Sequence, residues 1–563
     1  MPSRSLYANV VDIIGRTILA CEIKISGTRI ESIKPLSDRV DESLPYAFPG
    51  FIDAHIHIES SMLIPSEFAR LASVHGTVAT VSDPHEIANV MGIEGIEFML
   101  ESAKTVPLKF CFGAPSCVPA TSFETSGASL DANAVAALLA RPDIGYLAEM
   151  MNYPGVLLND PQVLAKIESA RDLGKPVDGH APGLVGNQAM TYANAGISTD
   201  HECTEFEEAL QKIEFGMKIL IREGSAAKNY EALKSLIDFH PDCVMLCSDD
   251  KHPDELADGH LNILVSRAVQ DGLDLFNVLR AACLNPIDHY SLPVGKLRVG
   301  DPADFVIVSD LVEFNVLQTF INGKCIAENG KANFDATCSR TINQFDCEPK
   351  QATDFNLKSN RMSSNTNVRV IETFDGELIS GELRTELWAN EAGLIQSDVK
   401  RDILKIAVVN RYRQSPVAVA FIRGFGLTQG AIASSVGHDS HNILAVGVDD
   451  ESLCAAINEV INHCGGIAAI KGDTVRSLPL PIGGIMSDKD GYWVANEYRA
   501  VDAFSKQTLG STLSAPFMTL SFMGLLVIPK LKLSDLGLFD GEHFKFVSVE
   551  CSSPDLENEN NAK

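Results

Sequence analysis

Eight short apolar runs, most ending in polar residues, recur between residues 51 and 249 of this 563-residue chain, and helix-like stretches separate several of them. Alternating strands and helices predict an α/β fold with a parallel sheet, and eight repeats predict a (β/α)8 TIM-like barrel. The runs lie at 51–57, 78–83, 108–113, 144–149, 176–180, 196–201, 218–223 and 243–249. Because such barrels place their chemistry at the C-terminal ends of the strands, the polar residues that end these runs are the first candidates for a functional site.

The barrel, at residues 49–290, is expected to interrupt a small β domain. Residues 1–48 carry short strand-like runs, and a similar texture returns at 291–335, where Asn322-Gly323 is a hairpin signal. A polar, irregular stretch at 331–368 then indicates a boundary. Residues 369–540 are expected to form a C-terminal α/β domain, with strands at 406–409 and 417–422 and an amphipathic helix at 450–464. Residues 541–563 are expected to be an extension that ends in a polar tail.

The composition restricts the classes of partner. The formal net charge is −28, which disfavours nucleic acid and anionic membranes because both would repel the chain. Residues 1–16 lack the unbroken apolar segment of a secretory signal. The longest apolar stretch, at 515–529, is shorter than the ~20 residues that a membrane-spanning helix needs. Thirteen scattered cysteines are typical of reduced thiols, so we expect a cytoplasmic protein. From the charge and the short apolar stretch we expect no nucleic-acid partner and no membrane partner.

His55-Ile56-His57 is the first candidate metal-binding element. Residues two apart on a strand face the same side, so both imidazoles can reach one ion from the end of the first barrel strand. Alone the motif is weak evidence, because two histidines on a strand are more often surface or packing residues. Its place at the end of the run that starts at Pro49 strengthens the metal-binding interpretation.

Four later strand ends supply further ligand types: Glu149, His180, His201 and Asp249. Each has an ordinary structural alternative, such as a solvated carboxylate or a helix cap, but a barrel brings all these ends together. Imidazole and carboxylate ligands without thiolate suit Zn, Mn or Fe(II). Four histidines and two carboxylates exceed what one tetrahedral ion requires. We therefore predict two divalent ions bridged by Glu149 and a hydroxide.

Longer strings around these residues resemble the adenine deaminases of the amidohydrolase superfamily. The resemblance extends to about residue 540, and its motifs are many and in order. They are FIDAHIHIESSML (51–63), SDPHEIANVMG (82–92), EMMNYPG (149–155), DGHAPG (178–183), DHECT (200–204), IREGS (221–225), SDDKHP (248–253), ASSVGHDSHN (433–442) and PLPIG (479–483).

The resemblance implies hydrolysis of adenine to hypoxanthine and ammonia at a binuclear centre, with Mn favoured and Fe(II) or Zn as alternatives. A homodimer is expected on the same ground. The family's metal ligands match His55, His57, Glu149, His180, His201 and Asp249. Asp83 matches an acidic position after the second strand that the family places in the site, whereas its neighbours His85 and Glu86 are as well explained by shaping the loop.

The expected chemistry begins with a water whose pKa a divalent ion lowers towards ~7, giving a hydroxide that attacks adenine C6. Asp249 is expected to accept the proton of this water and to carry it to the departing amine. Asp83 is the candidate for a second acid–base role. Arg222, at the end of the seventh strand, is expected either to face substrate or to form a structural ion pair. His438-Asp439-Ser440-His441-Asn442 is expected to be a lid or structural loop, with another metal site as the alternative.

Other functions compete with this interpretation. A near relative could act on N6-substituted adenine, and another cyclic amide or amidine hydrolase of the superfamily would share the metal ligands. A non-catalytic scaffold is disfavoured because every expected ligand position is filled. A zinc site of the cytidine-deaminase type is disfavoured because His57-Ile58-Glu59 is not followed by Pro-Cys-x-x-Cys.

Overall fold

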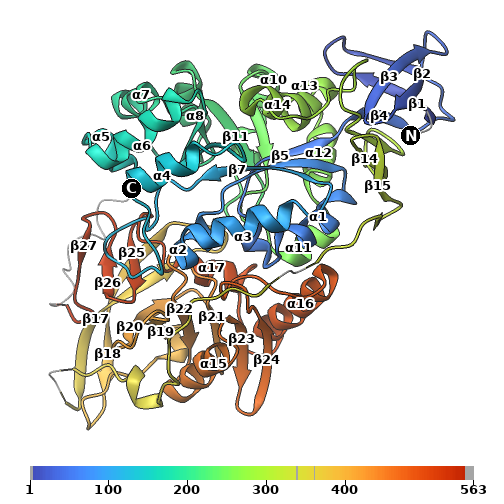
Figure 1. The fold of residues 1–563 in the computed structure, drawn as a ribbon. Coiled ribbons are helices and arrows are strands. Elements are labelled where there is room, and N and C mark those ends of the chain that lie inside the picture. The colour runs from blue at the N-terminus through green and yellow to red at the C-terminus, as the bar shows by residue number, and fades with distance from the viewer. Residues whose placement is uncertain (1–3, 338–339, 360–361, 552–563) are drawn as a thin grey trace.

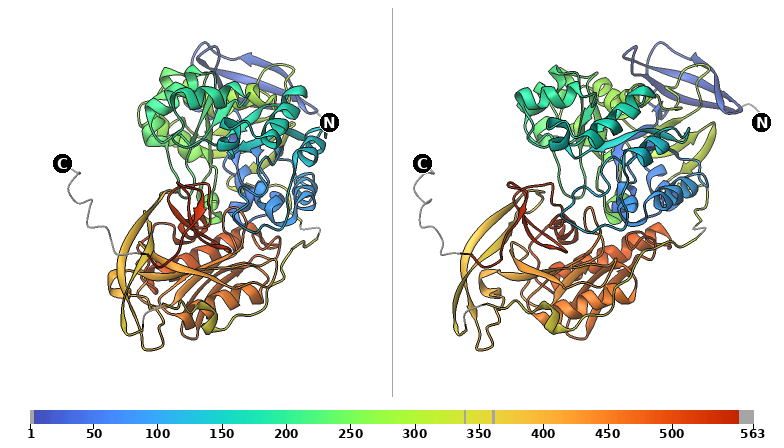
Figure 2. Two further views of the ribbon diagram at one scale, coloured as in Figure 1. Left: turned by 90° about the vertical axis from the view of Figure 1, so that its left-hand side faces the viewer. Right: turned by 60° about the vertical axis from the view of Figure 1, so that its left-hand side comes forward.

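The computed structural model describes residues 4–337, 340–359 and 362–551. A barrel with a small sheet beside it stands above a larger C-terminal sheet domain (Figure 1), and Figure 2 shows the same two layers from the side. Within the described residues, no helix is both long and apolar enough to cross a bilayer. The cysteines of these ranges are free thiols, and Cys338 lies outside them.

Each of the eight predicted runs contains a strand, and the strands other than β7 are buried along nearly their whole length, as expected when helices cover the outside of a parallel barrel. The strands are β5 (Phe51–Ile56), β6 (Thr77–Ser82), β7 (Lys109–Ala114), β8 (Ile144–Met150), β9 (Val177–Gly179), β10 (Thr199–Asp200), β11 (Lys218–Arg222) and β12 (Val244–Cys247). β9 and β10 are shorter than the predicted runs, and each ends directly before a histidine.

Two seams close the barrel. Parallel ladders join β5 through β9 in order and β10 through β12 in order. Between the two groups, Ser198 N donates to Val177 O at 2.8 Å. At the other seam, Asp249 N donates to His55 O at 2.9 Å, and His57 N donates to Asp249 O at 3.3 Å. The predicted (β/α)8 barrel is therefore confirmed, and its last seam is made by candidate ligands.

Helices follow the barrel strands and surround them. They are α1 (Pro65–Ser73), α2 (His85–Met91), α3 (Ile93–Ala103), α4 (Ala132–Leu139), α5 (Tyr153–Leu157), α6 (Pro161–Asp172), α7 (Gly186–Asn194), α8 (Phe206–Glu214), α9 (Tyr230–Leu233), α10 (Leu236–Phe239), α11 (Pro253–Asp258), α12 (Leu261–Gln270), α13 (Leu275–Leu279) and α14 (Asn285–Tyr290). Several begin with a side-chain cap: the carboxylate of Asp160, for example, accepts from the backbone of Gln162 at the start of α6.

One sheet unites the segments before and after the barrel. β4 pairs in parallel with β1 and antiparallel with β13, so it joins the two groups of strands. The strands are β1 (Arg4–Asp12), β2 (Thr17–Ser26), β3 (Arg29–Pro35), β4 (Tyr46–Pro49), β13 (Phe305–Val308), β14 (Val316–Ile321), β15 (Lys324–Glu328) and β16 (Lys331–Ala332). The domain boundaries drawn from the sequence at 48 and 291 stay predictions.

The C-terminal domain is a second eight-stranded sheet in the order β18-β17-β20-β19-β22-β21-β23-β24, with a short hairpin sheet beside it. Its elements are β17 (Ser364–Thr373), β18 (Ser380–Ala389), β19 (Leu404–Val409), β20 (Ala418–Arg423), β21 (Ala431–Ser434), β22 (Ile443–Gly447), α15 (Asp450–Asn462), β23 (Gly466–Lys471), β24 (Thr474–Pro479), α16 (Gly491–Gln507), α17 (Pro516–Phe522), β25 (Leu531–Ser534), β26 (Gly537–Asp540) and β27 (Lys545–Phe546). β17 begins upstream of residue 369, and residues 549–551 bond to its backbone. The expected polar tail lies outside the described residues.

Alternation along the central strands sends side chains to two different cores. On β22, Ile443 and Ala445 pack with α15, whereas Leu444 and Val446 belong to the core shared with the barrel. The sheet therefore has one face covered by a helix and one face turned towards the barrel. The loop after β21 and the end of α17 lie on the barrel side, where they reach the mouth.

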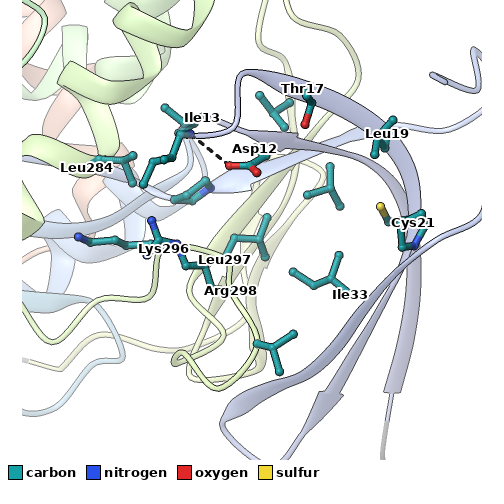
Figure 3. A pocket seen from close by; sticks show the side chains of 16 residues that line it. Asp12, Ile13, Thr17, Leu19, Cys21, Ile33, Leu284, Lys296, Leu297 and Arg298 are labelled. Atoms are coloured by element: carbon teal, nitrogen blue, oxygen red, sulfur yellow. Dashed lines mark hydrogen bonds between the residues drawn. The ribbon is translucent and has the colours of Figure 1, made fainter. Parts of the chain in front are cut away.

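A separate hollow lies between the small sheet and residues 296–299 (Figure 3). Its lining is largely apolar, with Leu19 and Ile33 from the sheet and Leu284 from the barrel side. The carboxylate of Asp12 accepts hydrogen bonds from the backbone of Ile14 and Gly15, so it serves its own turn. The hollow therefore contributes nothing to the predicted site.

Candidate functional site

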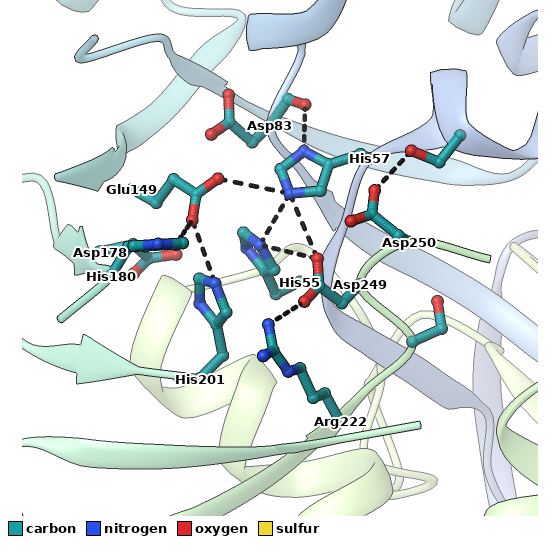
Figure 4. Close-up of polar contacts among 12 residues, drawn as sticks. His55, His57, Asp83, Glu149, Asp178, His180, His201, Arg222, Asp249 and Asp250 are labelled. Carbon is teal, nitrogen blue, oxygen red and sulfur yellow. Dashed lines mark hydrogen bonds and ion pairs between the residues drawn. The ribbon is translucent and has the colours of Figure 1, made fainter. Parts of the chain in front are cut away.

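Six side chains predicted as metal ligands converge at the C-terminal mouth of the barrel (Figure 4). All six are buried. They are His55 on β5, His57 just after it, Glu149 on β8, His180 after β9, His201 after β10 and Asp249 after β12. Asp249 adopts a left-handed φ of 54°, a conformation that is rare for residues other than glycine. Barrel closure thus gathers residues that are up to 194 positions apart.

Glu149 lies at the centre, and its two oxygens face different histidines. Oε1 lies 3.4 Å from His57 Nε2. Oε2 lies 2.9 Å from His180 Nδ1 and 3.0 Å from His201 Nε2. A carboxylate placed in this way divides the imidazoles into two groups and touches both.

The first group is completed by His55 and Asp249. His55 Nε2 and His57 Nε2 lie 3.2 Å apart, and Asp249 Oδ1 lies 3.8 Å and 3.4 Å from them. Ligand atoms that bind one ion at 2.0–2.2 Å are roughly 3–3.5 Å from one another. The spacing of these nitrogen and oxygen atoms is therefore suited to a shared cation.

The chemistry of the donor set supports the same fit. His55 Nε2, His57 Nε2 and His180 Nδ1 are the ring nitrogens that face the carboxylates of the cluster. The opposite nitrogens, His55 Nδ1 and His180 Nε2, are buried and have no hydrogen-bond partner among the described residues. Nitrogen and carboxylate oxygen donors without a thiolate suit Zn, Mn or Fe(II).

Charge pairing offsets the cost of burying these groups. Burial raises the pKa of Glu149, but His180 and His201 outweigh it, so the pKa lies well below its usual range. Burial lowers the pKa of His57, but Asp249 and Glu149 hold it well above the usual value. The pKa of His55 lies well below its usual value, because burial and then the neighbouring His201 and His57 disfavour its charged form.

Arg222, at the end of β11, forms the ion pair that the sequence left open. Its Nη1 lies 2.6 Å from Asp249 Oδ2, and its Nη2 donates to Glu202 Oε2 at 3.0 Å. Burial raises the pKa of Asp249, but Arg222 lowers it by more, so the pKa lies well below its usual value and the carboxylate is ionised. Glu202 is a site residue that sequence reasoning missed, since its Oε1 lies 3.3 Å from His201 Nε2. The sequence signal that could have revealed Glu202 was its position directly after His201, a predicted ligand.

Asp83 lies beside the centre, where its carboxylate contacts His85 and its backbone oxygen contacts His57. Its Oδ2 lies 2.9 Å from His85 Nδ1, and its backbone oxygen lies 3.3 Å from His57 Nδ1. His85 lines the cavity and lies 3.4 Å from Glu149 Oε1. The Asp83 carboxylate therefore fixes the position of His85, for which loop shaping was an equally good explanation from the sequence.

The polar loop at 438–442 packs over the mouth of the barrel. The two carboxylate oxygens of Glu86 contact His438 Nδ1 and His441 Nε2. Both histidines come from the C-terminal domain, whereas Glu86 lies in the first turn of α2. This buried cluster joins the two domains. His85, Glu86 and Asp439 also lie close enough together to hold an ion, so the lid or structural role and the alternative of another metal site both stay predictions.

Comparison with known proteins agrees with the sequence motifs. A model of the "Amidohydrolase family" matches residues 46–326, and a model of the "Adenine deaminase C-terminal domain" matches residues 377–545. An adenine deaminase of Salinibacter ruber is 53% identical over 97% of this chain and 98% of its own length. Adenine deaminases of Sulfurovum sp. and Methanosarcina mazei are 52% and 51% identical over 96% of this chain, and over 99% and 98% of their own lengths.

The chain belongs to the adenine deaminase family. The resemblance stated from the sequence is therefore confirmed over nearly the whole chain. An amidohydrolase from an environmental sample of the Sargasso Sea aligns at a TM-score of 0.45 and 15% identity, over 59% of this chain and 94% of that chain.

Family membership bears on the metal. The amidohydrolase superfamily implies divalent metal binding, and this adenine deaminase-family chain presents buried clusters that can hold ions. The clusters include His55 with His57 and Asp249, and His55 with Glu149 and His201.

Proposed function

We propose that this protein hydrolyses adenine to hypoxanthine and ammonia at a centre of two divalent ions. The position of Glu149 is the observation that carries this proposal, since each of its oxygens faces a different group of histidines. Full-length similarity to adenine deaminases supports adenine as the substrate.

The two groups of side chains divide the ligands between two ions. His55, His57 and Asp249 would hold one ion, His180 and His201 the other, and Glu149 both. When bound, such ions activate water as a nucleophile at neutral pH and stabilise developing negative charge. Mn is the metal we favour, on the strength of the family resemblance. Fe(II) and Zn are alternatives, because imidazole and carboxylate ligands accept all three metals.

Asp249 is the proposed general base. Arg222 holds its Oδ2 at 2.6 Å, so Oδ1 is directed towards the histidine pair. The carboxylate is ionised, so it can accept the proton of the attacking water. Adenine releases its amino group only once that group is protonated, so we propose that Asp249 then donates the same proton to the leaving amine.

Asp83 is the proposed second acid–base group, and it acts together with His85. The Asp83 carboxylate fixes the orientation of the imidazole. Burial lowers the pKa of His85, but Asp83 and Glu86 hold it well above the usual value. The ring lies on the cavity wall, where we propose that it donates a proton to the purine.

Ammonia release from adenine tests the proposed function. The protein is purified with added Mn²⁺, and adenosine and N6-methyladenine are assayed in parallel, the latter for methylamine. Release from adenine alone is the expected result. Activity only on N6-methyladenine would move the substrate to N6-substituted bases. Silence on all three, in protein that holds about two ions, would overturn the proposal and favour a cyclic amide substrate.

We also propose a homodimer, on the strength of the family resemblance, and a cytoplasmic location, on the strength of the scattered cysteines. Light scattering coupled to gel filtration tests the assembly, and a monomer mass would contradict it.

A further inference from the structure

The C-terminal domain supplies one wall of the cavity that contains the candidate metal ligands. His438 and Asp439 from the loop after β21 lie on this wall with three apolar side chains. The apolar residues are Leu378, Phe522 and Leu525. The Phe522 ring stacks on the His438 imidazole, with centroids 5.2 Å apart and planes inclined by 29°. The wall therefore combines flat apolar surface with a carboxylate, which is the lining that a heteroaromatic ligand needs.

Asp439 has an unused acceptor. Its side chain is 3% exposed, and Oδ2 has no hydrogen-bond partner among the described residues. Its other oxygen, Oδ1, lies 3.8 Å from His85 Nε2. An unsatisfied buried carboxylate oxygen is costly, so its persistence at a cavity wall indicates that a ligand supplies the missing donor.

The loop that carries Asp439 is held in place from several sides. Glu86 contacts the histidines on either side of it, His438 and His441. The Tyr412 hydroxyl donates to the backbone oxygen of Ser440 at 2.6 Å. A carboxylate fixed in this way loses little freedom on binding, so its hydrogen bond contributes fully to affinity.

Asp439 lies one imidazole away from the proposed metal centre. The imidazole of His85 lies between two carboxylates, with Nδ1 3.4 Å from Glu149 Oε1 and Nε2 3.8 Å from Asp439 Oδ1. A ligand that reaches both groups must therefore lie beside the His85 ring. A purine has the extent for this, because its amino-bearing carbon is in one ring and its imidazole N–H is in the other.

We propose that Asp439 is a specificity residue that accepts a hydrogen bond from the imidazole-ring N–H of a free purine base. This inference rests on the proposed function. A carboxylate can only accept hydrogen bonds, so it favours a ligand with a ring N–H. Purines substituted at N9, nucleosides included, have no such N–H and would leave the carboxylate unpaired.

The test compares adenine with 9-methyladenine in the metal-loaded wild-type protein and in Asp439→Ala. In the wild type, kcat/KM for adenine should exceed that for 9-methyladenine by at least about 10-fold. The variant should lose about 10- to 100-fold with adenine, the range for one hydrogen bond to a charged group, and change little with 9-methyladenine. The ratio between the two substrates should therefore fall towards one.

Three results would overturn the inference. A wild type that does not discriminate would remove its basis. An equal loss with both substrates would assign Asp439 to the shared amino group or to structure. A ratio that stays as large in the variant would assign the discrimination to steric exclusion. Wild-type protein that is silent on adenine would instead overturn the proposed function, so the two failures are distinguishable.

Two further variants and a binding measurement guard against misfolding. Asp439→Asn keeps the shape of the side chain and one oxygen acceptor, so it should show a smaller loss in the same direction. Asp398→Ala removes an aspartate that bonds Arg401 in the same domain and should leave the ratio unchanged. Equilibrium dialysis with hypoxanthine and 9-methylhypoxanthine should give the same pattern in Kd without turnover, and equal affinity of the variant for both ligands is expected.

Discussion

Lys212 on α8 is a buried lysine that holds the segments carrying His180 and His201 in place. Its replacement should lower both the stability of the protein and its metal content. Its Nζ is fully buried and donates to Asp200 Oδ2 at 2.5 Å, Glu208 Oε1 at 2.7 Å and Ala181 O at 2.7 Å. Asp200 directly precedes His201, and Ala181 directly follows His180. Lys212→Met keeps the length of the side chain but removes its charge and its three hydrogen bonds.

The expected loss of stability follows from the unpaired charge that remains. Removing one partner of a buried ion pair costs about 3–5 kcal/mol. For a domain the size of this barrel, 1 kcal/mol corresponds to about 2–4 °C, so Tm should fall by roughly 6–20 °C. Burial raises the pKa of Asp200 and Lys212 lowers it below its usual value. Without the lysine the pKa rises above its unfolded value, so the loss should be larger at pH 8 than at pH 5.

Thermal melting at both pH values and metal analysis of the purified protein measure these effects. Because His180 and His201 lose their brace, metal content should fall from about two ions towards one. Lys405→Met is the matched control, since Lys405 is buried and pairs with Asp450 at 2.6 Å in the C-terminal domain. It should lower Tm and leave metal content intact. Lys212→Met combined with Asp200→Asn should recover part of the loss. A fall in Tm of less than about 3 °C, or no recovery in the double variant, would refute the reasoning.

Three other substitutions give distinct outcomes. Asp249→Asn should lower kcat by about 100- to 10,000-fold while metal content stays largely intact, and near-normal turnover would contradict its role as base. Glu149→Gln should reduce the metal content of the purified protein to about one ion or fewer, because one oxygen of the proposed bridge becomes an amide; two tightly held ions would argue against bridging. Lys532→Met concerns a buried lysine whose pKa burial lowers to about 7. Between about pH 7 and 10 the unfolded chain holds this proton and the folded chain does not, so wild-type stability should rise with pH by up to about 1.4 kcal/mol per unit. Denaturant unfolding should show a flatter pH dependence in the variant, and an unchanged slope would exclude Lys532 as its source.

Strand ends could be predicted because burial and polarity are local properties of the sequence. His55, Glu149 and Asp249 each follow apolar residues that have to be covered, so their position at the end of a strand was visible in the pattern. His180 and His201 were predicted in the same way, although the strands that they follow, β9 and β10, are only three and two residues long. The sequence could not show which acids pair with which cations. Glu202 and Arg222 are 20 positions apart, and the parallel pairing of β10 with β11 makes them neighbours.

The sequence by itself determined the barrel, the ligand types and the family, because periodic burial and ordered motifs are written along the chain. Tertiary structure decided which acceptors face the cavity. Glu86 and His441 are 355 positions apart, and no local pattern indicates that their contact places Asp439 on the cavity wall. Such contacts depend on how the barrel and the C-terminal sheet pack, and packing depends on the shapes of both surfaces together. The specificity proposed for Asp439 is therefore a property of the interface between the barrel and the C-terminal domain.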